Sequence, residues 1–343
     1  MTLRNTFYSL FITALIIYIL YIAQNLLIPF VLAVVIWYLM ISIAKAIQAI
    51  PFVGQWVPYP LAVLGAFICS FAILWLLSTV VINNVTALVN LAPEYEQKLT
   101  TMVDTAMARF GVKNPPKIAD AFAGLDFATL ASSFAQTVSS LASKTGIIII
   151  YILFLLLEQH SFDTKLEALI SNKGKLEDTR GLITKIARQI QSYLRVKTFL
   201  SLLTASASYL VLKWIGVDFA EFWTMMIFLL NYIPTIGSIV ATVFPCLLTL
   251  VQFGTLYPFL FVTLGLGSIQ FVIGNILDPK MTGKSVNLSS LVILLSLSIW
   301  GTIWGVVGMF LCVPIMVIAN IIFANFTQTR PIAIILSRDG KVT

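Results

Sequence analysis

Polar residues that interrupt an apolar sequence are the first candidates for chemistry in this chain. The segment Asn231-Tyr-Ile-Pro-Thr-Ile-Gly237 stands inside residues 222–277, which contain no Asp, Glu, Lys or Arg. Pro234 removes a backbone donor and ends a helix, and Gly237 lets the chain turn. Two half-helices that end inside hydrocarbon present N–H and C=O groups to a small molecule or ion. We therefore expect a binding site formed by Asn231, Pro234, Thr235 and Gly237.

The alternative for this segment is a proline kink whose freed backbone groups are satisfied by a neighbouring helix. Length favours a reversal of the chain over two full crossings. Residues 222–233 and 238–253 would form helices of about 18 and 24 Å, against a hydrocarbon core of about 30 Å. We expect a re-entrant hairpin, with Thr235 or Ser238 capping its second helix.

A second polar group follows in residues 274–289. Asp278 beside Lys280 could form a gate by pairing, or Asp278 could be a proton-sensitive carboxylate; the alternative is that both charges only anchor a helix end at the membrane surface. Gln270 and Asn275 are neutral polar residues within the preceding apolar stretch, and we expect both to contact substrate. Because no charged residue lies deep in an apolar stretch, a polar molecule with little or no net charge fits best.

A third group of candidates, Ser298, Trp300 and Gly301, lies in residues 285–329, which also lack charge. We expect these residues to form the wall opposite the hairpin. Breaks are predicted at Trp300-Gly301 and at Pro314. The segment is either a second hairpin followed by an interfacial helix or two full spans, and its charge pattern does not separate the two.

Composition excludes a soluble protein. Hydrophobic residues make up 59% and charged residues 10% of the chain, and mean hydropathy is +0.98, whereas soluble domains are about 25% charged. The fold class predicted is an all-α polytopic membrane protein of about eight membrane segments, one or two of them re-entrant hairpins, with a small helical module outside the membrane.

No catalytic or cofactor chemistry is indicated. There is no phosphate-binding glycine motif, the three cysteines are unpaired by spacing, and a single histidine cannot build a multi-histidine metal site. We expect no enzyme activity, no metal and no cofactor. The net charge of +7 gathers in loops beside apolar stretches, which favours anionic lipids as partners over nucleic acid.

Four regions organise the chain. Residues 1–83 hold three spans, and residues 84–144 form a helical module outside the cell membrane. Residues 145–197 hold a fourth span and a basic amphipathic helix, which we expect on the cytoplasmic surface of the bilayer. Residues 198–343 form the core with the hairpins. Basic residues near span ends place both termini in the cytoplasm.

The motifs of the last third carry a family resemblance. They are Asn231 to Gly237, Gly274-Asn-Ile-Leu-Asp-Pro-Lys280, Gly283, Leu288-Ser289, Ser296-Leu297, Trp300-Gly301, Gly305, Gly308-Met309 and Val313-Pro314. Together they resemble the autoinducer-2 exporter-like family of bacterial transporters; the first half of the chain matches only in hydropathy and length. Where relatives carry Glu and Arg, this chain has Asp278 and Lys280.

The resemblance implies a bacterial inner-membrane transporter driven by ion or substrate gradients. Members are linked to export of the signalling molecule autoinducer-2 in quorum sensing, and others to sodium or lithium/proton antiport. Three hypotheses remain: an exporter of a small polar metabolite, a monovalent cation/proton antiporter with Asp278 as the titrating group, and a membrane scaffold that transports nothing. Glycines of the apolar stretches permit close helix packing, and we expect a homo-oligomer.

Overall fold

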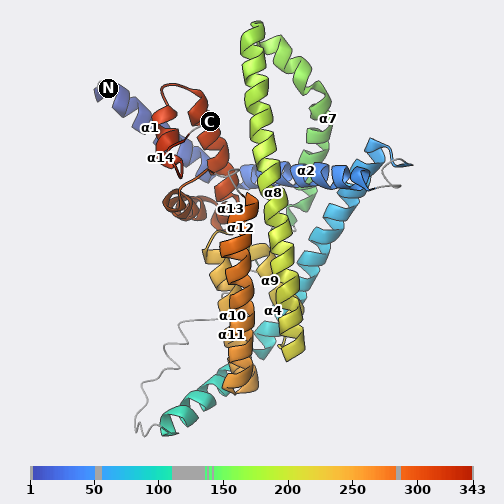
Figure 1. Ribbon diagram of the computed structural model, residues 1–343, viewed down its shortest axis with the longest axis vertical. Helices are drawn as coiled ribbons and strands as arrows, with labels where there is room; N and C mark the ends of the chain where they lie inside the picture. Colours follow the sequence, from blue (N-terminus) through green and yellow to red (C-terminus); the bar gives the residue numbers. More distant parts are fainter. Residues whose placement is uncertain are drawn as a thin grey trace. The chain divides into compact units, whose positions relative to one another are not determined.

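The fold is built from α-helices (Figure 1). The computed structural model describes residues 3–50, 56–109, 136, 139–140, 143–282 and 287–341, and these residues contain no strand. By length and composition six of the described helices could cross a membrane, or seven if the two bent parts of one helix, Thr145–Gln159 and Ser161–Leu169, count as one span. Two shorter apolar helices, Phe11–Ile22 and Ala220–Leu230, add to these. The prediction of an all-α polytopic membrane protein is confirmed.

The chain divides into two compact units. Unit 1 consists of Met1–Ser70, Lys144–Arg195 and Lys284–Thr343. Its helices are α1 (Leu3–Ile22), α2 (Gln24–Ala49), α7 (Thr145–Leu169), α13 (Ser290–Asn325), α14 (Arg330–Leu336) and the first half of α8 (Lys173–Ile215). Helix α2 packs along α7, where the rings of Phe30 and Tyr151 meet edge to face, and α14 packs against α13.

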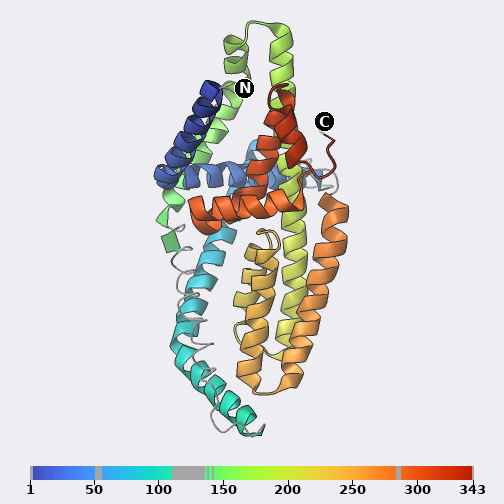
Figure 2. The ribbon, with the colours of Figure 1, turned by 90° about the vertical axis from the view of Figure 1, so that its left-hand side faces the viewer.

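Unit 2 consists of Phe71–Ser143 and Val196–Gly283. It holds most of α4 (Tyr59–Arg109), the second half of α8, α9 (Ala220–Leu230), α10 (Ile236–Phe253) and α11 (Leu256–Val272). A π-helix, η1 (Ile273–Leu277), joins α11 to the short α12 (Asp278–Thr282). In Figure 2, α9, α10 and α11 run side by side, gold to orange, along the second half of α8.

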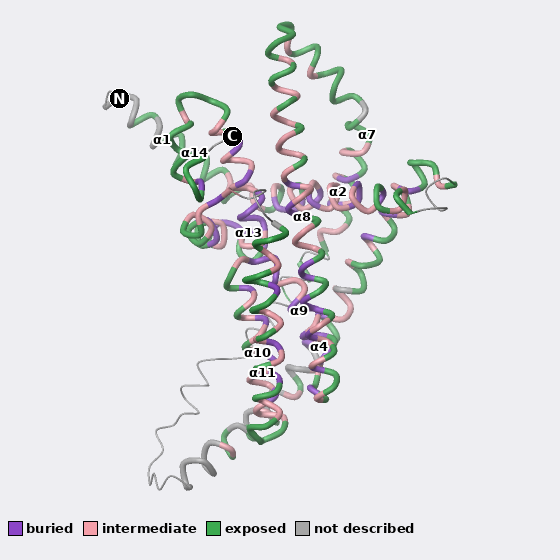
Figure 3. The backbone as a smooth tube through the Cα atoms, in the orientation of Figure 1, coloured by how far each residue is buried: buried purple, intermediate pink, exposed green. Residues whose placement is uncertain are grey.

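An apolar core joins these helices of unit 2. Buried positions recur along α8, α9 and α10, as the purple stretches of Figure 3 show. The core contains Val81 and Val85 of α4, Ala205 and Leu212 of α8, Phe222, Trp223 and Met226 of α9, Ala241 and Cys246 of α10, and Val262 and Leu266 of α11. Between helices in a membrane, such side chains gain van der Waals contacts with one another, so α9 and the middle of α10 are held by close apolar packing.

Two helices are longer than the sequence predicts. Helix α4 has 51 residues and continues from the third predicted span into the module predicted at residues 84–144, most of whose remainder lies outside the described residues. Helix α8 has 43 residues, about 65 Å, and the predicted boundary at 197/198 falls inside it. No Gly or Pro occurs between Gly181 and Gly216 to break it. The basic segment is therefore not a separate helix, because it is the first half of α8; its position at the bilayer surface stays a prediction.

Helix α13 is sharply kinked, although not where the sequence predicts. The non-helical residue is Gly305, with φ 61° and ψ −143°, instead of the Trp300-Gly301 pair. The predicted break at Pro314 is also wrong, because Pro314 is buried inside a helix that continues to Asn325. Helices in membranes tolerate such a proline when neighbouring groups satisfy the freed backbone. Beyond the kink the chain folds back, and the hydroxyl of Ser296 donates to the carbonyl of Cys312 at 3.5 Å.

The C-terminal tail is tied to the start of α13 by one amide side chain. Asn287 donates to Oδ1 of Asp339 at 3.0 Å and to the carbonyl of Lys341 at 2.7 Å, and it accepts from the backbone N–H of Arg338 at 3.1 Å. The pKa of Asp339 lies below its usual value, because the Lys341 amide and the Asn287 side chain donate to its carboxylate.

Candidate functional site

The segment predicted as a broken helix is a helical hairpin. Helix α9 ends at Leu230 and α10 begins at Ile236, and the two helices pack against each other. Their lengths, 11 and 18 residues, correspond to about 16 and 27 Å. The chain therefore reverses where the sequence predicts it. Entry of this hairpin into the membrane from one side stays a prediction, since α10 alone is long enough to count as a span.

The base of the hairpin is closed by Gln252. Its Nε2 donates to the carbonyl of Gly216 at 2.9 Å, and its Oε1 accepts from the N–H of Asp218 at 2.9 Å. Oδ2 of Asp218 accepts a further hydrogen bond from the hydroxyl of Tyr95 at 2.9 Å. Partial burial, and then this bond to a carboxylate, raise the pKa of Tyr95. The end of α10 is thus fastened to the loop that precedes α9.

The tip of the hairpin is a strained turn. The N–H of Ile236 donates to the carbonyl of Pro234 at 2.6 Å, and Thr235 between them has φ 60° and ψ −63°. These values define a γ-turn of the rare, strained kind, and a residue other than glycine held at positive φ costs about 1–3 kcal/mol. Thr235 and Ile236 are exposed, whereas Gly237 is buried.

The predicted capping of α10 is not made by Thr235. Thr235 occupies the N-cap position, but its side chain makes no capping bond. The positive φ of Thr235 differs from the extended backbone conformation of an ordinary N-cap residue. The hydroxyl of Ser238 donates to Oδ1 of Asn231 at 3.4 Å, which ties the two sides of the tip together.

At Gly237, α10 lies close against the end of α9. A Cβ atom built on Gly237 would overlap the carbonyl oxygen of Leu230 and come within 2.9 Å of the Cβ of Ile233. The obstructing oxygen belongs to the backbone, so no change of rotamer relieves the overlap. Gly237 therefore acts by allowing close packing inside the hairpin.

Asn231 and Gln270 are connected through Ser238, and the amide side chain of Asn231 is already hydrogen-bonded within the protein. It is 6% exposed, and its Nδ2 donates at 3.2 Å to the hydroxyl of Ser201, which is fully buried on α8. Gln270 of α11 donates to the carbonyl of Ser238 at 3.4 Å. A polar chain thus runs from α8 through the tip to α11. Asn275, in η1, is exposed and lies outside this chain of contacts.

The ion pair that the structure shows for Asp278 is formed with Lys197 of α8, whereas Lys280 is exposed. The Lys197 Nζ lies 3.2 Å from Oδ2 of Asp278, and the two side chains are 12% and 29% exposed. Pro279 does not end the helical chain, because α12 continues to Thr282. The wider π-turn before it, in which the N–H of Asp278 reaches the carbonyl of Ile273, makes room for the proline ring.

Sequence reasoning missed the residues that α8 contributes. They are Lys197, Thr198 and Ser201, and the hydroxyl of Thr198 shares a 2.7 Å hydrogen bond with that of Tyr232. A signal was present, since Lys197, Ser201, Thr204 and Ser208 recur at intervals of four, three and four residues. That spacing places polar groups on one face of a helix whose other residues are mostly apolar. The last three of these residues are at most 2% exposed.

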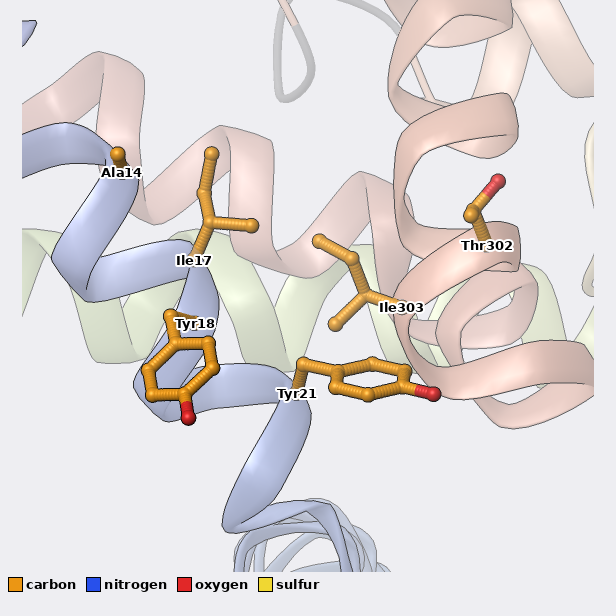
Figure 4. A pocket seen from close by; sticks show the side chains of 6 residues that line it. All are labelled: Ala14, Ile17, Tyr18, Tyr21, Thr302 and Ile303. Atoms are coloured by element: carbon orange, nitrogen blue, oxygen red, sulfur yellow. The ribbon is translucent and has the colours of Figure 1, made fainter.

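The third group of candidates belongs to unit 1. Ser298 is exposed and bonds to the carbonyl of Leu294 in its own helix, and Trp300 packs on Trp304. A cavity of about 450 Å³ lies between α1 and α13. Figure 4 shows the side chains that line it, which are those of Ala14, Ile17, Tyr18, Tyr21, Thr302 and Ile303. Its walls are almost wholly apolar, so it suits hydrocarbon better than a polar metabolite. Ser298, Trp300 and Gly301 do not line it.

The sequence of this chain matches a known family and several known proteins. The family described as AI-2E family transporter matches residues 10–328. The AI-2 transport protein TqsA of Escherichia coli is 33% identical over 62% of this chain and 61% of its own length. A protein of Borreliella burgdorferi is 32% identical over 74% of this chain and 70% of its length. One of Haemophilus influenzae is 28% identical over 92% and 90%. The last two are provisionally named transport proteins.

Proposed function

The chain belongs to the AI-2E family of transporters, and from this premise we propose that it is a secondary transporter that exports a small polar metabolite resembling autoinducer-2. The name of TqsA, which assigns that protein to AI-2 transport, supports this class of substrate. The apolar helices make it a multi-pass membrane protein. In this proposal the protein lies in the bacterial inner membrane. Both of its termini lie on the cytoplasmic side, which the basic residues near span ends favour.

The strained, exposed turn at the hairpin tip is the observation that supports this function best. The carbonyl end of α9 and the N–H end of α10 meet around it, which brings the two kinds of backbone group at helix ends to one place. In this proposal Thr235 and the backbone of Pro234 contact substrate directly. Gln270 and Asn275 provide amide groups from the α11 side. Asn231 and Gly237 hold the shape of the tip.

Substrate contacts from Ser298, Trp300 and Gly301 are also part of the proposal, as contacts from α13. Two further components concern partners. Self-association is supported by glycines of the apolar stretches such as Gly267, which permit close helix packing. Contact of the first half of α8 with anionic lipid is supported by its basic residues, although Arg180 pairs with Glu167 of α7 at 2.5 Å.

A second candidate function is exchange of a monovalent cation for protons. The ion pair of Lys197 and Asp278 favours it, because a small cation that reaches the Asp278 carboxylate would compete with the Lys197 ammonium group. Lys280 would then serve as a basic group at the entrance. In sealed vesicles, Asp278→Asn should abolish cation flux driven by a pH gradient. Unchanged flux in that variant would remove Asp278 from the mechanism.

Flux of autoinducer-2 into proteoliposomes tests the main proposal, with sodium and proton gradients imposed separately. Thr235→Trp fills the exposed tip and should abolish flux. Ile239→Trp is the matched control, since Ile239 is 57% exposed on α10 about one turn from the tip. Wild-type flux in Thr235→Trp would show that the tip is not the site. Absence of flux in the unmodified protein under every gradient would refute autoinducer-2 as substrate.

A further inference from the structure

One turn of α8 holds the hairpin tip through side chains. Thr198 bonds to Tyr232 at 2.7 Å and Ser201 to Asn231 at 3.2 Å. On the same turn, Lys197 pairs with Asp278 of α12. We call Lys197, Thr198 and Ser201 the docking turn. It fastens two separate elements, the tip and α12, by polar contacts.

The two ends of the hairpin are attached to unit 2 by different forces. The base is held by the apolar core, which includes Phe222, Trp223 and Met226, and by the Gln252 bonds to the loop before α9. The tip is held by two neutral hydrogen bonds to the docking turn, each of which contributes little net stability, by the bond from Gln270 to Ser238, and by the burial of the Tyr232 and Ile233 side chains. The contact between tip and docking turn is therefore the weaker of the two attachments.

The hairpin itself resists internal rearrangement. The close approach of α9 and α10 at Gly237 leaves no room for the two helices to slide past each other without a change in the backbone. Any motion of the tip is then a movement of the whole hairpin about its base.

We propose that the docking turn is the closed position of a gate: the hairpin tip leaves Thr198 and Ser201, and Asp278 leaves Lys197, once in each transport cycle. The proposal rests on the transporter function proposed above and deepens it. It assigns positioning roles to three residues of α8 that do not lie in the substrate-binding turn. The pivot is the hairpin base, where Gln252 keeps its contacts throughout the cycle.

A thiol reporter tests undocking without any substrate. Ile233 lies in the tip, is 5% exposed and makes none of the docking bonds named above. Ile233→Cys is placed in a Cys69→Ser background, since Cys246 and Cys312 are buried. Labelling by a membrane-impermeant methanethiosulfonate reagent is then followed in vesicles. Adding Ser201→Ala and Tyr232→Phe together removes both docking bonds and should raise the labelling rate about tenfold.

Thr204→Val is the matched control. Thr204 is 1% exposed on α8, and its hydroxyl bonds within its own helix, to the carbonyl of Leu200. This variant should label at the rate of the reporter alone. Equal rates for the docking variant and the Thr204→Val control would overturn the proposal. Size-exclusion profiles and labelling of Thr235→Cys, which is exposed in the docked state, check that each protein is folded.

Cross-linking provides a second measurement. The pair Ser201→Cys and Asn231→Cys should form a disulfide that stops autoinducer-2 flux until reductant is added. The pair Asp218→Cys and Gln252→Cys links the hairpin base, and its oxidation should leave flux unchanged. Full flux through the oxidised tip pair would refute the gate. Failure of autoinducer-2 flux in every protein would refute the proposed substrate alone, because the thiol-labelling result does not depend on it.

Discussion

Replacing Gly237 by alanine tests the hairpin geometry most directly. The added Cβ would overlap the carbonyl oxygen of Leu230 and crowd the Cβ of Ile233. Both obstructions are fixed to the backbone, so α9 and α10 must separate, which weakens the packing of the core beneath them. Overpacking by one methyl group typically costs about 1–3 kcal/mol. We expect the upper part of this range, about 2–3 kcal/mol, which lowers the ratio of folded to unfolded protein by about 30- to 150-fold.

Gly267→Ala in α11 is the control for Gly237→Ala. A Cβ on Gly267 meets no atom within 4 Å, so alanine there should be neutral or stabilise the helix by about 0.5–1 kcal/mol. Unfolding of both variants in detergent micelles is followed by tryptophan fluorescence with increasing denaturant and, separately, with temperature. If Gly237→Ala unfolds at the same midpoint as Gly267→Ala, the close approach of the two helices is wrong. A large loss of stability confined to Gly237→Ala supports it.

Three other outcomes follow from the same structure. Gly305→Ala should lower the thermal midpoint of detergent-solubilised protein, because φ 61° and ψ −143° are open almost only to glycine, at a cost of about 1–3 kcal/mol; an unchanged midpoint would move the kink elsewhere. Lys197→Met should destabilise by about 1–2 kcal/mol more than Lys213→Met in chemical unfolding, since the first removes the ammonium partner of a 29% exposed carboxylate and the second that of a 53% exposed one. Exchanging Lys197 and Asp278 should recover part of the loss. The lowered pKa of Asp339 means that its hydrogen bonds stabilise the tail above about pH 4 and are lost as the pH falls through the folded-state pKa. The difference in melting midpoint between wild type and Asp339→Ala should therefore be present at pH 7 and should shrink as the pH is lowered below about 4.

The position of the hairpin could be predicted because local signals agree. Pro234 and Gly237 stand between two apolar segments, and the helices end and resume beside them. The continuity of α8 was within reach of the same reasoning, since no breaker separates its basic and apolar halves. A preference for assigning charged and apolar segments to different elements led to the wrong expectation. Charge pattern reports where a segment meets water, and helix breakers report where it ends.

The kink of α13 shows what local signals do not decide. Glycines at positions 301, 305 and 308 are all suitable for a break by composition. In the structure Gly305 alone of the three takes positive φ, whereas Gly308 lets the backbone carbonyl of Trp300 approach and Gly301 faces the side chain of Met309. The roles differ because packing between the two arms of the helix assigns them. No pattern in the sequence distinguishes a glycine needed for its φ angle from one needed for its small size.

The sequence by itself determined that the chain is a polytopic helical membrane protein, and that its apolar run breaks at residues 231–237. Hydropathy and helix breakers are local properties, so they can be read without the fold. The tertiary structure alone decided that Asn231 bonds to Ser201 and that Asp278 pairs with Lys197, 81 residues away. Such partners depend on which helix faces come together. That choice is made by the apolar core that α8 shares with α9, α10 and α11.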